Sequence, residues 1–258
     1  MEFAGGVQLQ LDQSRRGTLF VPVVVNGRQL RFIFDTGASI TAVTPAVADA
    51  LGLVPSGTIL VNGTIPARLT MLETLSVASI QHDHVRAAIV ALPEEKRIDE
   101  RFDGVLGLDI LSQHDIAIDF PRHRFVFYPP NHLARSDVLD DMIRVDFKKS
   151  RNGLVEVDIA FDERGPIPAY LDLGSQRTTT NSVTANWIEG GGEERAPRGL
   201  NLGNVRWEAF SIIVDDLPIF DQWIRADELA VILGADLFRD REVVLAYQDG
   251  ALFVSRAL

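Results

Sequence analysis

The chain has 258 residues, with 25 lysines and arginines against 36 aspartates and glutamates, which gives a formal net charge of −11. Apolar residues make up 46% and charged residues 24%, a composition that excludes a disordered or collagen-like chain. The length allows two small domains or one large one. The acidic balance argues against nucleic acid as a partner. Because there is no cysteine, disulfides, cysteine-ligated zinc and thiol catalysis are excluded.

Targeting signals in this sequence are weak. No apolar stretch reaches the roughly 18 residues of a membrane span. The first six residues are too short and too acidic for a signal peptide. A secreted protein without its leader would look the same, so the compartment stays open at this point.

Tight-turn sequences between apolar runs predict β-hairpins. Asn26-Gly27 and Asn62-Gly63 both favour two-residue turns. The strands that they join are 18–25 with 30–34, and 59–61 with 68–72. In the second half, a turn that contains Gly165 and Pro166 is predicted between strands 154–161 and 168–171.

Two short helices are predicted, one in each half of the chain. The clearer one covers 45–51, with Thr44 as its N-cap, Pro45 in its first position and Gly52 at its end. Its counterpart is predicted over 182–188. The other periodic segments are typical of strands, so the sequence predicts a mainly β fold.

An internal duplication divides the chain into two lobes. Gly107-Leu108-Asp109 aligns with Gly234-Ala235-Asp236 at an offset of 234 − 107 = 127, and a pair of strands follows each in step. Upstream the offset is 172 − 35 = 137, a difference that loops absorb at little cost. Pro129-Pro130 cannot extend a strand and marks the seam. The predicted domains are lobes 1–133 and 134–258.

An acid follows an apolar strand in each half. In the first, 32–34 leads into Asp35-Thr36-Gly37-Ala38-Ser39, where Gly37 permits a tight turn beside the carboxylate. In the second, the corresponding run is Asp172-Leu173-Gly174-Ser175. Alone, Asp35 would be ordinary turn chemistry. Both motifs, however, have an apolar pair and a glycine downstream: Val105-Leu106-Gly107 and Ile232-Leu233-Gly234.

These motifs resemble those of the aspartic peptidases of the pepsin and retropepsin clan. The likeness is greatest to the two-lobed, bacterial periplasmic, retroviral-type aspartyl proteases, and it covers nearly the whole chain. Asp35-Thr36-Gly37-Ala38 is similar to the retropepsin motif, and 102–111 resembles the segment downstream of it. The second motif departs from the family at Leu173, where threonine is usual. The resemblance implies an acid protease fold with two pseudo-symmetric β-barrel-like lobes.

The implied function is that of an aspartic endopeptidase, with Asp35 and Asp172 face to face between the lobes. Two carboxylates at such a short distance share a proton. The charged one would activate a water, and the protonated one would hydrogen-bond the scissile carbonyl. The supporting loop residues would be Thr36, Gly37, Ala38, Ser39, Leu173, Gly174 and Ser175. The chain lacks the serine-hydrolase and zinc-protease motifs.

The resemblance also bears on partners and compartment. It implies no cofactor and no metal, and a protein or peptide substrate bound in extended form. It further implies a monomer in the periplasm or outside the cell. A hairpin over 59–72 is the candidate flap, with a tip whose glycine and polarity suit a moving loop; a static surface hairpin is the alternative. The tip residues are Val61, Asn62, Gly63, Thr64 and Ile65.

Other polar residues have plainer interpretations. His82 and His84 would share a strand face as a candidate metal pair, but without a third ligand nearby we expect exposed strand polarity. Asp109 and Asp236 are expected to be structural acids that open short helical turns. Three more histidines are expected to be solvated in polar turns: His114, His123 and His132.

Two other functions stay open beside the active monomeric peptidase. Leu173 is compatible with a peptidase-fold module that binds extended peptides and catalyses weakly. A homodimer that uses only the Asp35 lobe is the third reading, and the acid already duplicated at Asp172 argues against it.

Overall fold

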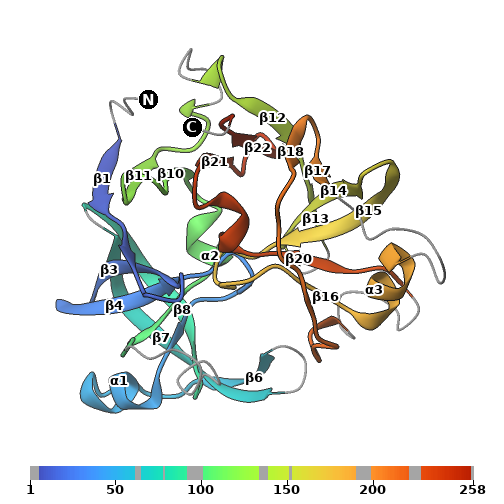
Figure 1. Cartoon of the computed structure of the whole chain (residues 1–258). Coiled ribbons are helices and arrows are strands. Elements are labelled where there is room, and N and C mark those ends of the chain that lie inside the picture. The colour runs from blue at the N-terminus through green and yellow to red at the C-terminus, as the bar shows by residue number, and fades with distance from the viewer. Residues whose placement is uncertain are drawn as a thin grey trace.

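The computed structural model describes residues 6–61, 65–77, 79–91, 101–133, 139–150, 153–189, 199–220 and 228–256. In this part the fold is mainly β, with three sheets and a few short helices. Figure 1 shows one sheet across the top and a lobe on either side below it. No helix of the described part is long and apolar enough to cross a membrane.

A six-stranded sheet joins the two halves of the chain. Its order is β1 (Val7–Gln10), β11 (Arg124–Tyr128), β10 (Asp115–Asp119), β21 (Glu242–Ala246), β22 (Ala251–Val254) and β12 (Ile143–Asp146). In the central antiparallel pair, Ala117 of β10 lies opposite Val244 of β21. Since 244 − 117 = 127 is the offset of the duplication, Ala117 faces its own counterpart, and the pseudo-twofold axis passes between these two residues.

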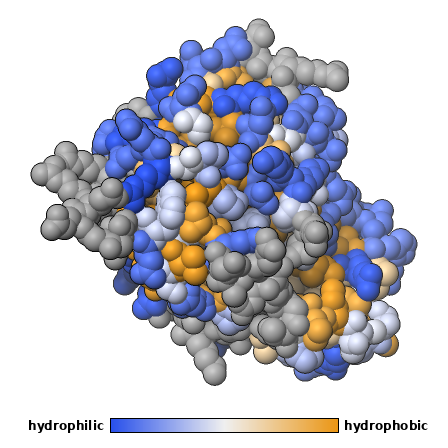
Figure 2. All heavy atoms as spheres, turned by 90° about the vertical axis from the view of Figure 1, so that its right-hand side faces the viewer, coloured by the Kyte–Doolittle hydropathy of each residue, from blue (hydrophilic) through white to orange (hydrophobic). Residues whose placement is uncertain are grey.

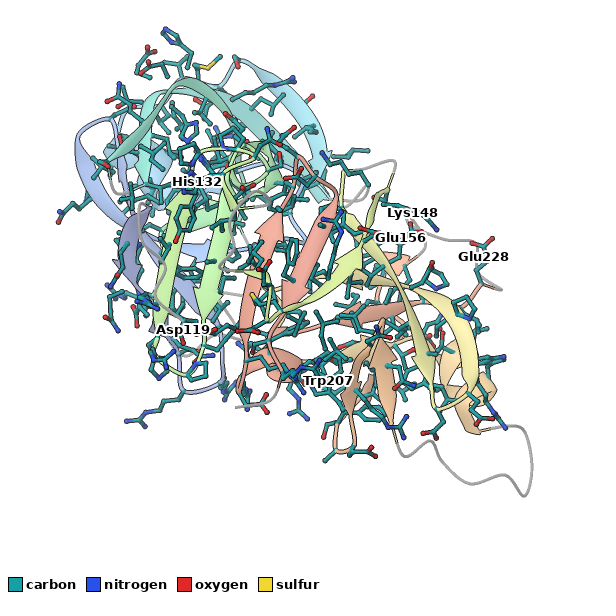
Figure 3. All side chains as sticks on the ribbon, turned by 90° about the horizontal axis from the view of Figure 1, so that it is seen from above. Asp119, His132, Lys148, Glu156, Trp207 and Glu228 are labelled. Atoms are coloured by element: carbon teal, nitrogen blue, oxygen red, sulfur yellow. The ribbon has the colours of Figure 1, made fainter. Side chains whose placement is uncertain are left out.

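One end of this sheet carries buried carboxylates. Asp119 and Glu242 lie opposite each other, fully or almost fully buried. Arg122 Nη1 bridges them, at 3.1 Å from Asp119 Oδ2 and 3.0 Å from Glu242 Oε1, and Arg124 adds a second bond to Asp119 at 3.1 Å. Figure 3 shows Asp119 at the end of β10. These cations compensate charges that would otherwise be costly to bury.

The first lobe is a closed barrel. Its sheet order is β2 (Asp12–Gln13), β3 (Leu19–Val25), β4 (Arg28–Phe34), β9 (Gly104–Leu106), β5 (Ala42–Val43), β8 (Ile80–Ile89), β7 (Ile65–Val77) and β6 (Gly57–Val61). An additional pairing of β3 with β7 closes six of these strands into a ring. The predicted helix is present as α1 (Pro45–Ala50), and Thr44 Oγ1 caps it by accepting from Val47 N at 3.4 Å.

The second lobe repeats the plan as a half-barrel. Its order is β18 (Val205–Trp207), β17 (Leu200–Leu202), β14 (Val155–Phe161), β15 (Arg164–Leu171), β20 (Val231–Leu233), β16 (Thr179–Thr180) and β19 (Ile213–Val214), with β13 (Lys148–Lys149) beside β14. Figure 3 shows Lys148 and Glu156 side by side, as the β13–β14 register requires. The second predicted helix is α3 (Ser182–Glu189). The expected mainly β fold with two barrel-like lobes is therefore confirmed, with one lobe less closed than the other.

The hairpin predictions hold except at one turn. Asn26 and Gly27 both have positive φ, as a tight hairpin turn between β3 and β4 needs, and β6 pairs with β7 as expected. The predicted turn at Gly165-Pro166 is wrong, because β15 already begins at Arg164. Asp162, with φ of 52°, makes the turn instead, since a short polar side chain tolerates this backbone. The boundary between 133 and 134 borders residues outside the described part and stays a prediction.

The apolar core is continuous from lobe to lobe. One cluster of buried side chains includes Phe34 and Leu106 of the first lobe together with Leu173 and Leu233 of the second. Figure 2 turns the second lobe toward the viewer and shows apolar atoms in separate patches among hydrophilic ones. Among the residues that the structure describes, the exposed large apolar ones are Val54, Leu60, Met71, Ile213 and Val214. The segments that follow β4 and β15 thus sit on one packed core.

Candidate active site

A parallel strand pair positions each of the two acids. In the first lobe, β4 runs parallel to β9 with Phe34 opposite Leu106, and Asp35 N donates to Leu106 O at 3.2 Å. In the second, β15 runs parallel to β20, and Asp172 N donates to Leu233 O at 3.0 Å. The apolar pair before each downstream glycine therefore forms the strand that pairs with the acid-bearing strand and holds the acid at the edge of the core.

The loop after each acid wraps around one carboxylate oxygen. Asp35 Oδ1 accepts from Gly37 N at 2.7 Å and from Ala38 N at 3.0 Å. Asp172 Oδ1 accepts in the same way from Gly174 N at 2.9 Å and from Ser175 N at 3.0 Å. Two backbone donors per acid fix the rotation of both side chains.

The structure brings Asp35 and Asp172 together across the lobe interface. A Cβ added to Gly37 would lie 2.5 Å from the carboxyl carbon of Asp172, and one added to Gly174 would lie 2.5 Å from that of Asp35. Any side chain at either glycine would therefore collide with the opposite acid. The two aspartate side chains also hydrogen-bond each other. This is the pairing that the duplication predicts.

The pair favours retention of a proton. Burial raises the pKa of Asp172 above that of an ordinary aspartate, and this outweighs the hydrogen bonds from Ser175 N, the Asp35 side chain, Gly174 N and Gly37 N, which act in the opposite direction. Two carboxyl groups in contact titrate as one coupled pair. The arrangement holds one proton between them in a pH range where isolated aspartates are ionised.

Thr36 reaches across the interface without a matching threonine from the second lobe. Its Oγ1 donates to Leu171 O at 2.8 Å and accepts from Leu173 N at 2.8 Å, and the residue is fully buried. Leu173 occupies the equivalent place in the other lobe, is also fully buried, and has no hydroxyl to return these bonds. The interlobe contact is therefore asymmetric at the centre of the site.

Asp109 anchors the Asp35 loop from behind. Its Oδ1 accepts from Thr41 N at 2.9 Å and from Thr41 Oγ1 at 2.7 Å, and Thr41 Oγ1 accepts from Gly107 N at 3.2 Å. Asp109 lies in the first turn of α2 (Leu108–Leu111). Burial raises the pKa of Asp109, against the hydrogen bonds from Thr41. The expected structural role of Asp109 is confirmed.

The second lobe repeats this anchor. Asp236, in the first turn of η4 (Ala235–Phe238), accepts from Thr178 N at 2.9 Å and from Thr178 Oγ1 at 2.8 Å, and Gly234 N donates to Thr178 Oγ1 at 3.2 Å. Sequence reasoning missed both threonines. Their signal was available: each lies six residues after its acid, since 41 − 35 and 178 − 172 are both 6.

The remaining predicted site residues are the two loop serines and the residues of the flap. Ser39 is exposed, and the Ser175 hydroxyl donates to Arg177 O at 2.9 Å, so Ser175 serves Asp172 through its backbone. Val61 and Ile65 form the last pair of the β6–β7 hairpin. The other flap residues, Asn62, Gly63 and Thr64, lie outside the described residues, and the role of the flap stays a prediction.

Two expectations about the histidines are wrong. His84 has φ of 51°, which takes it off the alternation of β8, and it is exposed near Glu73, so it shares no face with His82. His114 is only 7% exposed rather than solvated, and its Nε2 lies 3.2 Å from Nε2 of His82. Burial lowers the pKa of both rings. His123 and His132 are exposed, as expected.

The comparisons with known proteins agree with the geometry of the first lobe. A family described as "Aspartyl protease" matches residues 21–110, a range that contains the Asp35 loop, the β6–β7 hairpin and Gly107. Asp172 and the second lobe lie outside that range. A search of curated proteins gives no match to the chain. Residues 21–110 thus form an aspartyl protease domain of the retropepsin-like kind.

Proposed function

We propose that the protein is an aspartic endopeptidase that hydrolyses peptide bonds with a water held between Asp35 and Asp172. One observation carries this proposal: each loop glycine is packed against the opposite acid, so the two carboxyl groups meet. Their mutual hydrogen bond and the raised pKa of Asp172 support a shared proton, which this chemistry requires.

The two carboxyl groups have different tasks in this reaction. The protonated member of the pair donates a hydrogen bond to the scissile carbonyl oxygen. The ionised member takes a proton from the water as the water oxygen attacks the carbonyl carbon. The proton of the first carboxyl group passes to the carbonyl oxygen, which gives a tetrahedral diol. When the C–N bond breaks, the proton taken from the water goes to the leaving nitrogen. One hydroxyl of the diol returns its proton to the other carboxylate, so the pair again holds one proton.

The proposal extends to the substrate, the oligomeric state and the cellular compartment. An extended peptide with large apolar residues beside the scissile bond suits a site between two apolar β-lobes, and the β6–β7 hairpin would cover it. One chain supplies both acids, which supports a monomer. A periplasmic or extracellular setting rests on the resemblance alone.

Substitution of each acid tests the proposal. Asp35→Asn and Asp172→Asn should each reduce the cleavage of an unstructured protein to background while the variants stay folded. Asp49→Asn is the matched control, because Asp49 is exposed on α1. If one of the two site variants cleaves near the wild-type rate, the water is not activated by a pair and the proposal is wrong.

Leu173 favours a second candidate function, a module that binds extended peptides and catalyses weakly. Leu173 has no hydroxyl to repeat the two interlobe bonds that Thr36 makes beside the acids. A non-cleavable peptide that mimics the tetrahedral diol separates the two. Tight binding with negligible turnover of the matching peptide would favour the module, and binding with turnover would favour the enzyme.

A further inference from the structure

A second cluster of chemically active side chains lies in the first lobe, outside the aspartate pair. His82 comes from β8, and His114 follows α2, 32 residues later. Their Nε2 atoms are 3.2 Å apart, with the ring planes at 80° to each other. His114 is buried, whereas His82 is only half-buried and reaches solvent. Two imidazole nitrogens therefore meet at the edge of the core.

An oxygen atom lies near each ring. Gln113 uses its Nε2 to donate to Asp109 O at 2.7 Å, which leaves its Oε1 to accept from the His82 ring. The Tyr128 carbonyl lies beside the His114 ring. Nδ1 of His114 is buried there and reaches no full hydrogen-bond geometry with any described residue.

Two hydrogen arrangements fit this contact: one ring donates its Nε2–H to the other, or both rings keep their hydrogen on Nδ1. An imidazole that keeps its hydrogen on Nδ1, toward an oxygen, has a bare lone pair on Nε2. With both rings in this form, two lone pairs face each other at 3.2 Å. Such an arrangement is repulsive unless a cation lies between the two nitrogens.

We propose that His82 and His114 bind a divalent transition-metal ion through their Nε2 atoms. With metal–nitrogen bonds of about 2.0–2.1 Å, a nitrogen separation of 3.2 Å gives an angle of about 100° at the metal, close to tetrahedral. Gln113 and the Tyr128 carbonyl would orient the rings, since metal-bound histidines commonly direct their other N–H to an oxygen.

Water would complete the coordination. The described residues contain no group of three or more His, Cys, Asp or Glu side chains that could hold a metal. The ion would therefore have two protein ligands and an open side where His82 meets solvent. Affinity should be weaker than at sites with three or four protein ligands, and Cu²⁺ should bind more tightly than Zn²⁺.

The bound ion would join two elements of the first lobe. It would link β8 to the turn after α2, the helix whose Asp109 anchors Thr41. This is a structural cross-link and takes no part in the reaction at the aspartates. It stands or falls independently of the proposed peptidase activity.

Calorimetric titration of the tag-free protein with ZnCl₂ at neutral pH tests the site. Wild type should bind one ion, and its melting temperature should rise with Zn²⁺ concentration, because a ligand specific to the folded state stabilises it. His82→Ala should lose both effects; His82 is half-buried, so this variant is chosen over one at the buried His114. His84→Ala is the matched control on the same strand, and it should bind as wild type does.

Co²⁺ provides a spectroscopic readout that does not depend on stability. Visible absorption typical of a low-coordinate cobalt site should appear in wild type and His84→Ala and be absent in His82→Ala. The proposal is overturned if wild type binds neither ion, or if His82→Ala binds as tightly as wild type. A third outcome is that the wild-type protein binds neither ion and its histidine pair takes up a proton at mildly acidic pH. This result would identify the contact as a hydrogen bond with a shared proton, and it would equally overturn the metal site.

Discussion

Thr36 carries on its own a contact that a symmetric molecule would make twice. Its hydroxyl satisfies a carbonyl and an amide of the opposite lobe, both beside Asp172. Thr36→Val keeps the shape but leaves Leu171 O and Leu173 N buried without a partner, at about 1–3 kcal/mol for each. We expect a lower free energy of unfolding in urea and slower cleavage. Thr36→Ser keeps the hydroxyl and is the control; equal losses in both variants would mean that packing, not hydrogen bonding, is what matters.

Leu173 offers the complementary change. By the duplication, a hydroxyl at this position would reach Phe34 O and Thr36 N, because 171 − 137 = 34 and 173 − 137 = 36. Leu173→Thr should raise turnover, since small misplacements at a catalytic pair cost as much as ~100-fold. Each new bond gives about 0.5–1.5 kcal/mol, which offsets lost apolar burial, so the melting temperature should change little. Lower activity or an unfolded second lobe would instead mark Leu173 as a packing residue around which the site is built.

At the scale of elements, the anchors Asp109–Thr41 and Asp236–Thr178 connect each helical turn to its acid-bearing loop. Asp236→Ala removes the acceptor for two hydrogen bonds, and bonds to charged groups are worth about 1.5–3 kcal/mol each. We expect a loss of stability of this order, together with a fall in kcat. Asp236→Asn keeps an oxygen acceptor and should lose much less, as measured by urea unfolding. If both variants behave alike, the negative charge itself is needed at this position.

Local chemistry explains which elements the sequence could predict. The Asn26-Gly27 turn and the Thr44 cap depend on neighbours in the chain, and both are present. The turn predicted at Gly165-Pro166 was wrong, because the chain already turns at Asp162. Aspartate tolerates the positive φ that this turn needs. The open second barrel could not be predicted, since strand pairing at its edge is decided by distant segments.

The candidate site also has features that the sequence could predict and features that it could not. The aspartate pair was predictable because the duplication places Asp35 and Asp172 on equivalent strand ends, and the axis at Ala117 and Val244 brings equivalent points together. The contact of His82 with His114 was not predictable, because it joins separate elements with no repeated pattern to mark it. The threonine anchors lie between these cases: their spacing repeats, but a lone threonine has no signature of its own.

For the whole molecule, the aspartate pair links stability to pH. The folded pKa of Asp172 lies above its unfolded value of 3.8, so its stabilising contribution is complete below that value and is lost as pH rises through the folded pKa. Asp172→Asn stays neutral throughout. Relative to this variant, wild type should lose melting temperature as the pH rises above 3.8 and through the folded pKa of Asp172. A difference that does not change with pH would contradict the retained proton.

Cleavage should follow the same titration. The rate needs one ionised and one protonated carboxyl group, so it should be bell-shaped and confined to the acid side of neutrality. The descending limb should lie above the pKa of an ordinary aspartate, because the pKa of Asp172 is raised. A flat profile up to about pH 9 would contradict a shared proton.

The β10–β21 pairing also dictates when, during synthesis, the two acids can meet. Among the described strands it is the pairing that joins the halves, and β21 lies 123 residues after β10, since 242 − 119 = 123. A ribosome adds roughly 5–20 residues per second and releases the first lobe long before the second. While β10 waits, its free edge is exposed to unwanted pairing with other chains. The nascent chain acquires a facing pair of carboxyl groups only after Glu242–Ala246 has emerged from the ribosome. Peptidase activity would therefore appear only at a late stage of synthesis.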